Sequence, residues 1–295
     1  MVKVTLLVLL LSLAQAPRFL SDPPIKCDAC DDWNKPREPF KVYGNTYFVG
    51  TDGLSAILIT GDQGHILLDG ALPQSAPLID ANIRKLGFKT QDVKLIVNSH
   101  GHYDHAGGIA ALQRATGARV AASPSGASAL QRGENTTDDP QYGFGREANA
   151  FPPVEDVDVI TDNENLTVGN VTITAIFTPG HTPGATSWTW KSCEGLSCMH
   201  MVYADSISAV AAPGFKFTDK PELVASFRRS ITRLGELPCD IVISTHPSAT
   251  NLDAKLKQRA GRKPGDADPF VDRGCKALAA TAMKGLAARI AEEKK

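Results

Sequence analysis

The sequence predicts an α/β sandwich with approximate twofold symmetry and a metal site at one edge. Apolar, strand-like runs alternate with helical segments in both halves of the chain, and two runs end alike, in Leu95-Ile-Val-Asn-Ser-His100 and Ile241-Val-Ile-Ser-Thr-His246. Three of the seven histidines fall between residues 100 and 105. Because ligands of such sheets gather beyond the carboxyl ends of the strands, we expect the strand-end histidines to share one edge.

The first half of the chain carries signals of both strands and helices. Strands are expected at residues 40–49, 54–60, 65–69, 93–98 and 118–122. The turn Gly61-Asp-Gln-Gly64 predicts a hairpin, and the continuous apolar run at 93–98 predicts a strand buried on both faces. Helices are expected at residues 76–86, 109–116 and 127–132. Residues 133–156, rich in Asp, Pro, Gly and Asn, predict a long loop of a kind that is often functional.

The second half repeats this pattern. Hairpin strands are expected at residues 166–178, 186–190 and 201–204, and another apolar strand at residues 240–244. A helix is expected at residues 221–234, and further helices at the end of the chain. Pro/Ser/Gly-rich spacers and charge blocks, which mark linkers, do not separate the two halves. We therefore expect residues 17–295 to form a single domain.

Residues 1–16 have the pattern of an export signal. One lysine precedes an apolar run from Val4 to Leu13, and Ala14-Gln-Ala16 has the small-x-small form of a signal-peptidase site. This run is too short to span a bilayer, which needs roughly 20 apolar residues. We expect a signal peptide at residues 1–16, with an approximate cleavage point, a periplasmic location and no membrane anchor.

The composition excludes some partners. The chain has 31 Lys and Arg residues against 32 Asp and Glu residues, a formal net charge of −1, and no basic run. Nucleic acid is not expected as a partner, because phosphate binding needs clustered basic residues. A chain with 42% hydrophobic residues can bury a large core. The sequence shows no evident protein partner.

Four of the six cysteines can be paired by position, and export favours disulfides. Cys193 and Cys198 flank a short turn between two strand-like runs, so a bridge between them would close a hairpin. A bridge between Cys239 and Cys275 would tie the last helix to the core.

Cys27 and Cys30 are left over in an Asp-rich stretch near the N-terminus. We expect a short local bridge or free thiols. The alternatives are a redox pair, which normally needs a strand-to-helix context, and a zinc site, which would need a second pair of ligands.

The residues most informative about function follow the buried strand at residues 93–98. They read His100-Gly-His102-Tyr-Asp104-His105-Ala-Gly107-Gly108. Imidazole nitrogen and carboxylate oxygen are the ligands that zinc takes. His100 and His102 are two residues apart, so in extended backbone they project to one side and can grip one ion together. Asp104 and His105 follow the bend and can turn toward a second ion.

Two further histidines complete the set of ligands. His181 lies in Thr178-Pro-Gly-His181, and His246 precedes Pro247. The grouping predicts two triads that each leave a position open, as catalytic sites do. A pair of ions would support hydrolysis by a metal-bound hydroxide, and a serine-hydrolase motif G-x-S-x-G is absent from the sequence. We expect His65 to be structural and His200 to lie at the surface.

The combination of H-x-H-x-D-H, T-P-G-H and a later strand-end histidine resembles the metallo-β-lactamase superfamily over nearly all the mature chain. The resemblance implies an αββα four-layer sandwich, with two mixed sheets flanked by helices and the metal site at one edge. Residues 184–193 and the segment Tyr203-Ala-Asp-Ser206-Ile-Ser208 are similar to subclass B3. So are the lack of a cysteine near Ser206, the presence of His105 and a disulfide between Cys239 and Cys275.

The resemblance also assigns roles to residues. The first zinc would be held by His100, His102 and His181, and the second by Asp104, His105 and His246. Asp104 would also orient the hydroxide. Substrate contacts would come from Ser206, Ser208, Tyr103 and Gln141, with the two serines on the carboxylate of a β-lactam. Asp69 and Asp205 would support the site without binding substrate, Asp69 by orienting a ligand histidine.

The implied activity is opening of the β-lactam ring of penicillins, cephalosporins and carbapenems, with two zinc ions per chain, which confers antibiotic resistance. Two alternatives stay open: an exported lactonase or thioesterase of the same fold, and a metal-dependent binding or scavenging protein. Asp205 distinguishes the enzymes, because thioesterase-like members have a carboxylate in this region that bridges both metals.

Overall fold

The computed structural model describes residues 19–295, in which two β-sheets pack face to face between two layers of helices. Both sheets contain parallel and antiparallel pairs. The αββα sandwich of two mixed sheets predicted from the resemblance is therefore confirmed. The signal peptide expected at residues 1–16 lies outside the described residues.

The first sheet has seven strands in the order of the sequence. They are β1 (Phe40–Tyr43), β2 (Thr46–Phe48), β3 (Ile57–Gly61), β4 (Gly64–Leu68), β5 (Val93–Val97), β6 (Arg119–Ala122) and β7 (Val157–Val159). Pairing is antiparallel from β1 to β4 and parallel from β4 to β7. The apolar runs of β4 and β5 reflect their central place, where both faces of the sheet are covered.

The second sheet has five strands in the order β12-β11-β10-β9-β8. They are β8 (Asn165–Val168), β9 (Val171–Phe177), β10 (Thr186–Glu194), β11 (Ser197–Ala204) and β12 (Ile241–Ser244). β12 pairs with β11 in parallel, and the other pairs are antiparallel.

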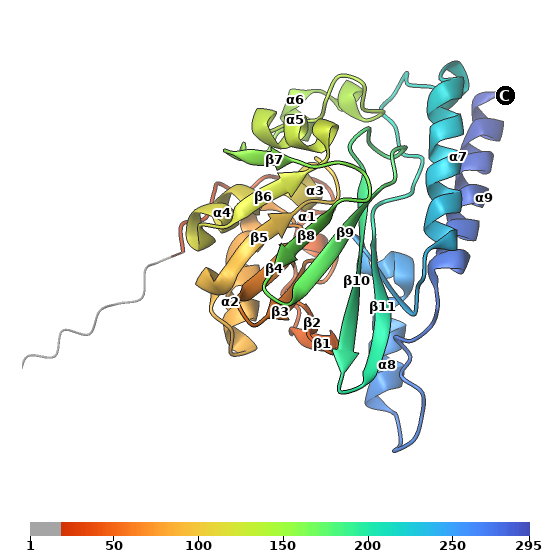
Figure 1. Cartoon of the computed structure of the whole chain (residues 1–295). Helices are drawn as coiled ribbons and strands as arrows, with labels where there is room; N and C mark the ends of the chain where they lie inside the picture. The colour runs from red at the N-terminus through yellow and green to blue at the C-terminus, as the bar shows by residue number, and fades with distance from the viewer. Residues whose placement is uncertain (1–18) are drawn as a thin grey trace, which may run out of the picture.

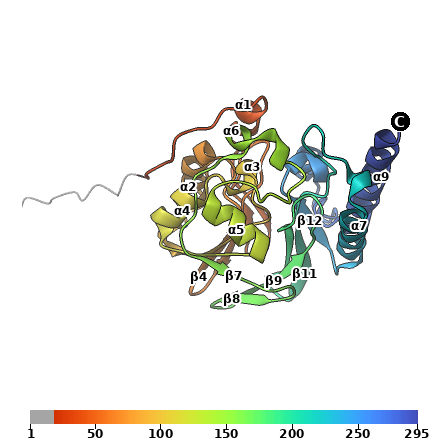
Figure 2. The same cartoon turned by 90° about the horizontal axis from the view of Figure 1, so that it is seen from above.

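The helices divide between the two outer layers. They are α1 (Cys30–Trp33), α2 (Ala76–Lys85), α3 (Tyr103–Ala106), α4 (Ile109–Thr116), α5 (Pro124–Arg132), α6 (Arg146–Asn149), α7 (Pro221–Glu236), α8 (Leu252–Ala260) and α9 (Cys275–Glu293). Figures 1 and 2 show α2, α4 and α5 outside the first sheet and α7 and α9 outside the second. Three buried apolar clusters fill the spaces between these four layers.

Two strands expected from the sequence are hairpins in the structure. The run at residues 40–49 divides into β1 and β2 at Gly44, where φ is +53°. The run at 166–178 divides into β8 and β9 at Gly169, where φ is +54°. Glycine adopts this left-handed conformation without the steric cost that a Cβ imposes. Apolar content alone did not separate a long strand from two short ones.

The structure contains three disulfides among the described residues: Cys27–Cys30, Cys193–Cys198 and Cys239–Cys275. Cys193 and Cys198 are directly paired across β10 and β11, so this bridge closes a hairpin as expected. Cys275 begins α9 and is buried in the cluster under that helix. Of the two states expected for Cys27 and Cys30, the structure has the local bridge. Within residues 19–295, no helix is both long and apolar enough to cross a bilayer.

The disulfides are expected to differ in their contribution to stability. Cys239 and Cys275 are 36 residues apart, and Cys193 and Cys198 only 5. In the chain-entropy model, the disulfide that closes the longer loop raises the free energy of unfolding by about 4 kcal/mol, and the one that closes the shorter loop raises it by about 2 kcal/mol. Urea unfolding should therefore show a larger loss in the free energy of unfolding for Cys239→Ala/Cys275→Ala than for Cys193→Ala/Cys198→Ala. Equal losses would show that α9 is held by its packing and not by its disulfide.

Candidate metal centre

The six ligands expected from the sequence meet at one edge of the sandwich. His100 and His102 follow β5, and Asp104 and His105 lie on α3. His181 follows β9 and His246 follows β12, so both sheets contribute. The symmetry expected from the matching ends of β5 and β12 thus brings one histidine from each sheet to this edge.

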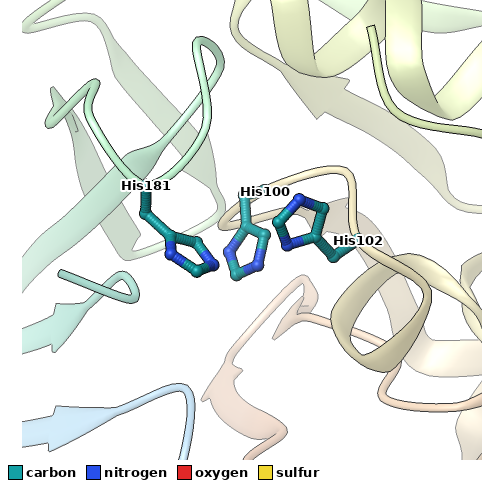
Figure 3. Close-up of side chains that lie close together, drawn as sticks. All are labelled: His100, His102 and His181. Atoms are coloured by element: carbon teal, nitrogen blue, oxygen red, sulfur yellow. The ribbon is translucent and has the colours of Figure 1, made fainter. Parts of the chain in front are cut away.

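His100, His102 and His181 form the first group. One nitrogen of each ring lies within 4.8 Å of the corresponding nitrogens of the other two, and all three residues are buried. Figure 3 shows the three rings converging from the loops that follow β5 and β9. Three imidazole nitrogens at this spacing suit a divalent transition metal.

The environment of His100 fits a bound cation. Its Nδ1 lies 2.6 Å from Oδ1 of Asp205, and both side chains are fully buried. Its Nε2 is also buried and has no hydrogen-bond partner among residues 19–295. A buried, unsatisfied polar atom is costly. A metal ion at Nε2 would satisfy this nitrogen.

The other two histidines of the group are also held through their second nitrogen. His102 Nε2 lies 3.0 Å from Oδ2 of the buried Asp139. His181 Nδ1 lies 2.9 Å from the carbonyl oxygen of Ser208, which accepts a hydrogen bond from it. Such contacts fix the tautomer and the ring orientation of a metal ligand. They leave His102 Nδ1 and His181 Nε2 to face the centre of the group.

The second group joins Asp104, His105 and His246. Asp104 Oδ2 lies 3.2 Å from His105 Nε2 and 3.4 Å from His246 Nε2, and the two imidazole nitrogens are 3.3 Å apart. His100, Asp104 and His105 also have one ligand atom each within 4.8 Å of one another. The two groups are therefore adjacent, and His100 of the first group lies next to Asp104 and His105 of the second.

The electrostatics leave the first group ready for a cation at neutral pH. Burial, followed by repulsion from the neighbouring imidazoles, holds the pKa of His100 well below its usual range. Burial and His102 lower the pKa of His181 to about 3. Both rings therefore keep the lone pair that a metal needs, without first losing a proton.

The second group is charged. Burial alone would raise the pKa of Asp104, but His105 and His246 together hold it well below its usual range. Burial alone would lower the pKa of His246, but Asp104 raises it. In the metal-free protein a proton on His246 therefore competes with a cation at this group.

Asp69 supports the site through hydrogen bonds to residues next to the ligands. Its carboxylate accepts hydrogen bonds from Asn98 Nδ2, from the backbone nitrogen and the hydroxyl of Ser99, and from the hydroxyl of Tyr203. Its φ of +61° is unfavourable for a residue with a Cβ, so these bonds hold a strained turn in place. The expected role of Asp69 in orienting a ligand histidine has weaker geometry, because His105 Nδ1 is 4.0 Å away.

Asp205 contacts the candidate ligand His100 and does not lie between the two groups. Its Oδ1 faces Nδ1 of His100, on the side of the ring away from the unpaired Nε2. Burial, followed by the charge of Asp69, raises the pKa of Asp205 well above its usual range.

The four expected substrate contacts are spread around the site. Gln141 Nε2 lies 3.4 Å from Nε2 of His181, so this loop residue reaches the candidate centre. Ser206 is buried, with its hydroxyl 2.9 Å from that of Thr245. Ser208 is exposed beside His181. Tyr103 is half-buried against the apolar cluster of the first helical layer, and burial raises its pKa to about 12.

Two residues of the site were missed by the sequence analysis. Asp139 lies in the loop at residues 133–156, and its neighbours in sequence give no sign that it faces His102. Trp33 packs its indole 5.3 Å from the imidazole of His246. The short helix α1 that carries it has no detectable periodicity.

The remaining histidines lie away from the centre. His65 is buried in β4 beside Phe88. His200 is on β11, with Nδ1 3.2 Å from Asp240 Oδ2 and a side chain that is 43% exposed. These positions agree with the structural and surface roles expected for them.

Comparisons with known proteins relate this geometry to a family. A family model described as the metallo-beta-lactamase superfamily matches residues 49–246. The structure of Rm3 metallo-beta-lactamase is 51% identical, with a TM-score of 0.87, and the match covers 92% of this chain and 100% of that chain. MEM-A1, a subclass B3 metallo-beta-lactamase from a soil metagenome library, is 45% identical, with a TM-score of 0.84 and coverage of 89% and 99%.

A curated relative is more distant. The hydroxyacylglutathione hydrolase of Cereibacter sphaeroides is 27% identical over 185 residues, which is 63% of this chain and only 58% of that protein's length. The family model covers more than half of the chain, and the similar solved structures cover nearly all of it. The chain therefore belongs to the metallo-beta-lactamase superfamily, and it resembles the subclass B3 enzymes in fold and sequence.

Proposed function

We propose that this protein is an exported zinc enzyme that hydrolyses the β-lactam ring of antibiotics and so confers resistance to them. The observation that carries the proposal is the pair of adjacent ligand groups at one edge of the sandwich, in a chain whose sequence is 51% identical to that of Rm3 metallo-beta-lactamase. The three disulfides support export to an oxidising compartment, which we take to be the periplasm. We assign residues 17–295 to one catalytic domain.

The residues fit zinc, because imidazole and carboxylate are its usual ligands. We assign one ion to His100, His102 and His181, and a second ion to Asp104, His105 and His246. Bound there, zinc would act as a Lewis acid and lower the pKa of a water molecule to near neutrality.

The protein's own contribution is to position the ligands. Asp205, Asp139 and the carbonyl of Ser208 each hold the second nitrogen of one histidine in the first group, so three rings are fixed before any ion arrives. The two groups are adjacent because Asp104 and His105 follow His102 on the single turn of α3. We assign to Asp104, whose lowered pKa keeps its carboxylate ionised, the role of orienting the attacking water.

Substrate would be held at both sides of this centre. We assign the carboxylate of the β-lactam to the hydroxyls of Ser206 and Ser208. Gln141 projects from the loop at 133–156 toward His181, so its amide can contact the opposite side of the ring system. We assign to Tyr103 an apolar contact with the substrate and not a hydrogen bond, since its side chain is partly buried against the apolar core.

A second candidate function is hydrolysis of a thioester or lactone, because the similar curated protein is a hydroxyacylglutathione hydrolase. The position of Asp205 supports the β-lactam proposal instead, since its carboxylate faces the back of His100 and does not bridge the two groups. Comparing a cephalosporin, an acyl-homoserine lactone and a glutathione thioester at equal enzyme concentration tests the choice. We expect the cephalosporin to give the highest kcat/KM, and preference for the thioester or lactone would overturn the proposal.

Replacing one ligand should abolish most of the activity. We expect His100→Ala to lower kcat/KM for a cephalosporin by more than the roughly 10- to 100-fold that loss of a supporting residue costs. His200→Ala is the matched control, because His200 lies on β11 away from both groups. Steady-state kinetics of the two variants would contradict the assignment if both losses were equally small.

Replacing Asp139 should weaken metal binding without unfolding the protein. Asp139→Ala removes the acceptor that holds His102 Nε2, so we expect zinc affinity to fall by about 10- to 100-fold. Asp138→Ala is the control, because Asp138 is adjacent to Asp139 in the sequence but is exposed. Competition with a coloured chelator measures both affinities, and wild-type affinity in Asp139→Ala would show that the contact is incidental.

The two zinc ions should differ in their response to acid. His246 has a raised pKa, so below that pKa each unit of pH costs the second ion up to about tenfold in affinity, through competition with the proton. His100 and His181 have lowered pKa values and stay neutral over the same interval. Zinc titrations at pH 7.5 and 5.5 should therefore weaken one equivalent more than the other. Equal weakening of both would contradict the assignment of His246 to one ion alone.

A further inference from the structure

A cavity of about 410 Å³ lies beside the candidate metal centre, between α9 and the segments that follow β11 and β12. His246 and Ser206 belong to its lining, so the cavity adjoins the residues that we assign to the second zinc and to the substrate carboxylate. Its volume falls within the range of roughly 300–1,000 Å³ that is typical of small-molecule sites.

The walls of this cavity are mostly apolar and small. The segment after β11 contributes Ile207, Ala209 and Val210, and Val210 is 45% exposed. One face of α9 supplies the opposite wall. Its residues, spaced by three or four positions so that they share one side of the helix, are Leu278, Thr281, Ala282, Gly285 and Arg289. Apolar walls next to a reactive centre favour an apolar part of a ligand.

Arg289 does not make this cavity a site for an anion. Its Nε lies 2.7 Å from Oε1 of Glu293, and Oε2 of Glu293 accepts a hydrogen bond from the backbone nitrogen of Thr218. The guanidinium charge is therefore already balanced within the fold. An uncharged group suits this cavity better than a second carboxylate.

Gly285 leaves space on the wall that α9 provides. A Cβ built at this position would meet no heavy atom within 4 Å. Glycine within a helix costs roughly 0.5–1 kcal/mol relative to alanine. A side chain at this position would therefore enter the cavity without displacing a neighbour.

We propose that this cavity is the subsite for the substituent next to the carboxylate of the β-lactam, and that α9 sets the size of the substituent it accepts. The inference rests on the proposed function. Ser206 and Ser208 line the same cavity, so a carboxylate held by them directs the adjoining substituent toward α9. The class of substrate is a β-lactam with a bulky, uncharged aromatic or heterocyclic group at that position.

The test compares two cephalosporins that differ only beside the carboxylate, one with a methyl group and one with a bulky heterocycle. We expect Gly285→Phe to lower kcat/KM for the bulky substrate at least tenfold, mainly through KM, and to change kcat/KM for the methyl substrate less than twofold. The ratio of the two values does not depend on the fraction of folded enzyme. It therefore stays informative even if the variant is less stable.

Two variants serve as controls. Gly285→Ala changes helix propensity with little bulk, and Ala287→Phe places the same ring on an exposed position of α9 that does not line the cavity. Both should keep the wild-type ratio. An unchanged ratio in Gly285→Phe, or an equal loss for both substrates, would overturn the subsite while leaving β-lactam hydrolysis intact. Failure of the wild-type enzyme to open either cephalosporin would instead overturn the proposed function.

Discussion

The contact between His100 and Asp205 joins the two sheets of the molecule at the point where the chemistry is concentrated. His100 follows β5 of the first sheet and Asp205 follows β11 of the second, and their 2.6 Å contact is completely buried. Three neighbouring bonds cross the sandwich in the same way: Tyr203 donates to Asp69, Trp188 donates to the carbonyl of Asn98, and Ser55 donates to the carbonyl of Ser244. Buried polar groups are tolerated only when they are paired. The alignment of the sheets and the geometry of the site are therefore set by the same network.

This network explains why the site is built for a cation. Three buried carboxylates, those of Asp69, Asp104 and Asp205, lie close to the imidazoles of the site, and burial keeps two of these, His100 and His181, neutral. The pKa of Asp205 is raised and that of Asp104 is lowered, so the negative charge is concentrated on the carboxylate that faces the second group. A divalent ion would balance that charge and satisfy the unpaired Nε2 of His100. The charge and the orphaned nitrogen are separate observations, and both favour the same occupant.

The sequence was sufficient to predict the sandwich and the meeting of the candidate ligands at one edge, and the reasons are local. Apolar runs identify β4 and β5, and the spacing of His100, His102, Asp104 and His105 identifies the centre without any knowledge of tertiary contacts. The hairpin turns at Gly44 and Gly169 were missed because a glycine within an apolar run does not reveal its φ. Asp139 was missed because its function depends on where a long loop folds back against His102. The cavity beside α9 was also beyond prediction, since its walls come from segments about 40 to 80 residues apart in the sequence.

The most direct test of this account is to remove all metal from the purified protein and then add zinc while following hydrolysis of a cephalosporin. We expect no measurable ring opening in the metal-free protein and recovery as zinc is added, with full activity at two equivalents per chain. Hydrolysis that persists after exhaustive chelation, with metal content verified as zero by atomic spectroscopy, would contradict it.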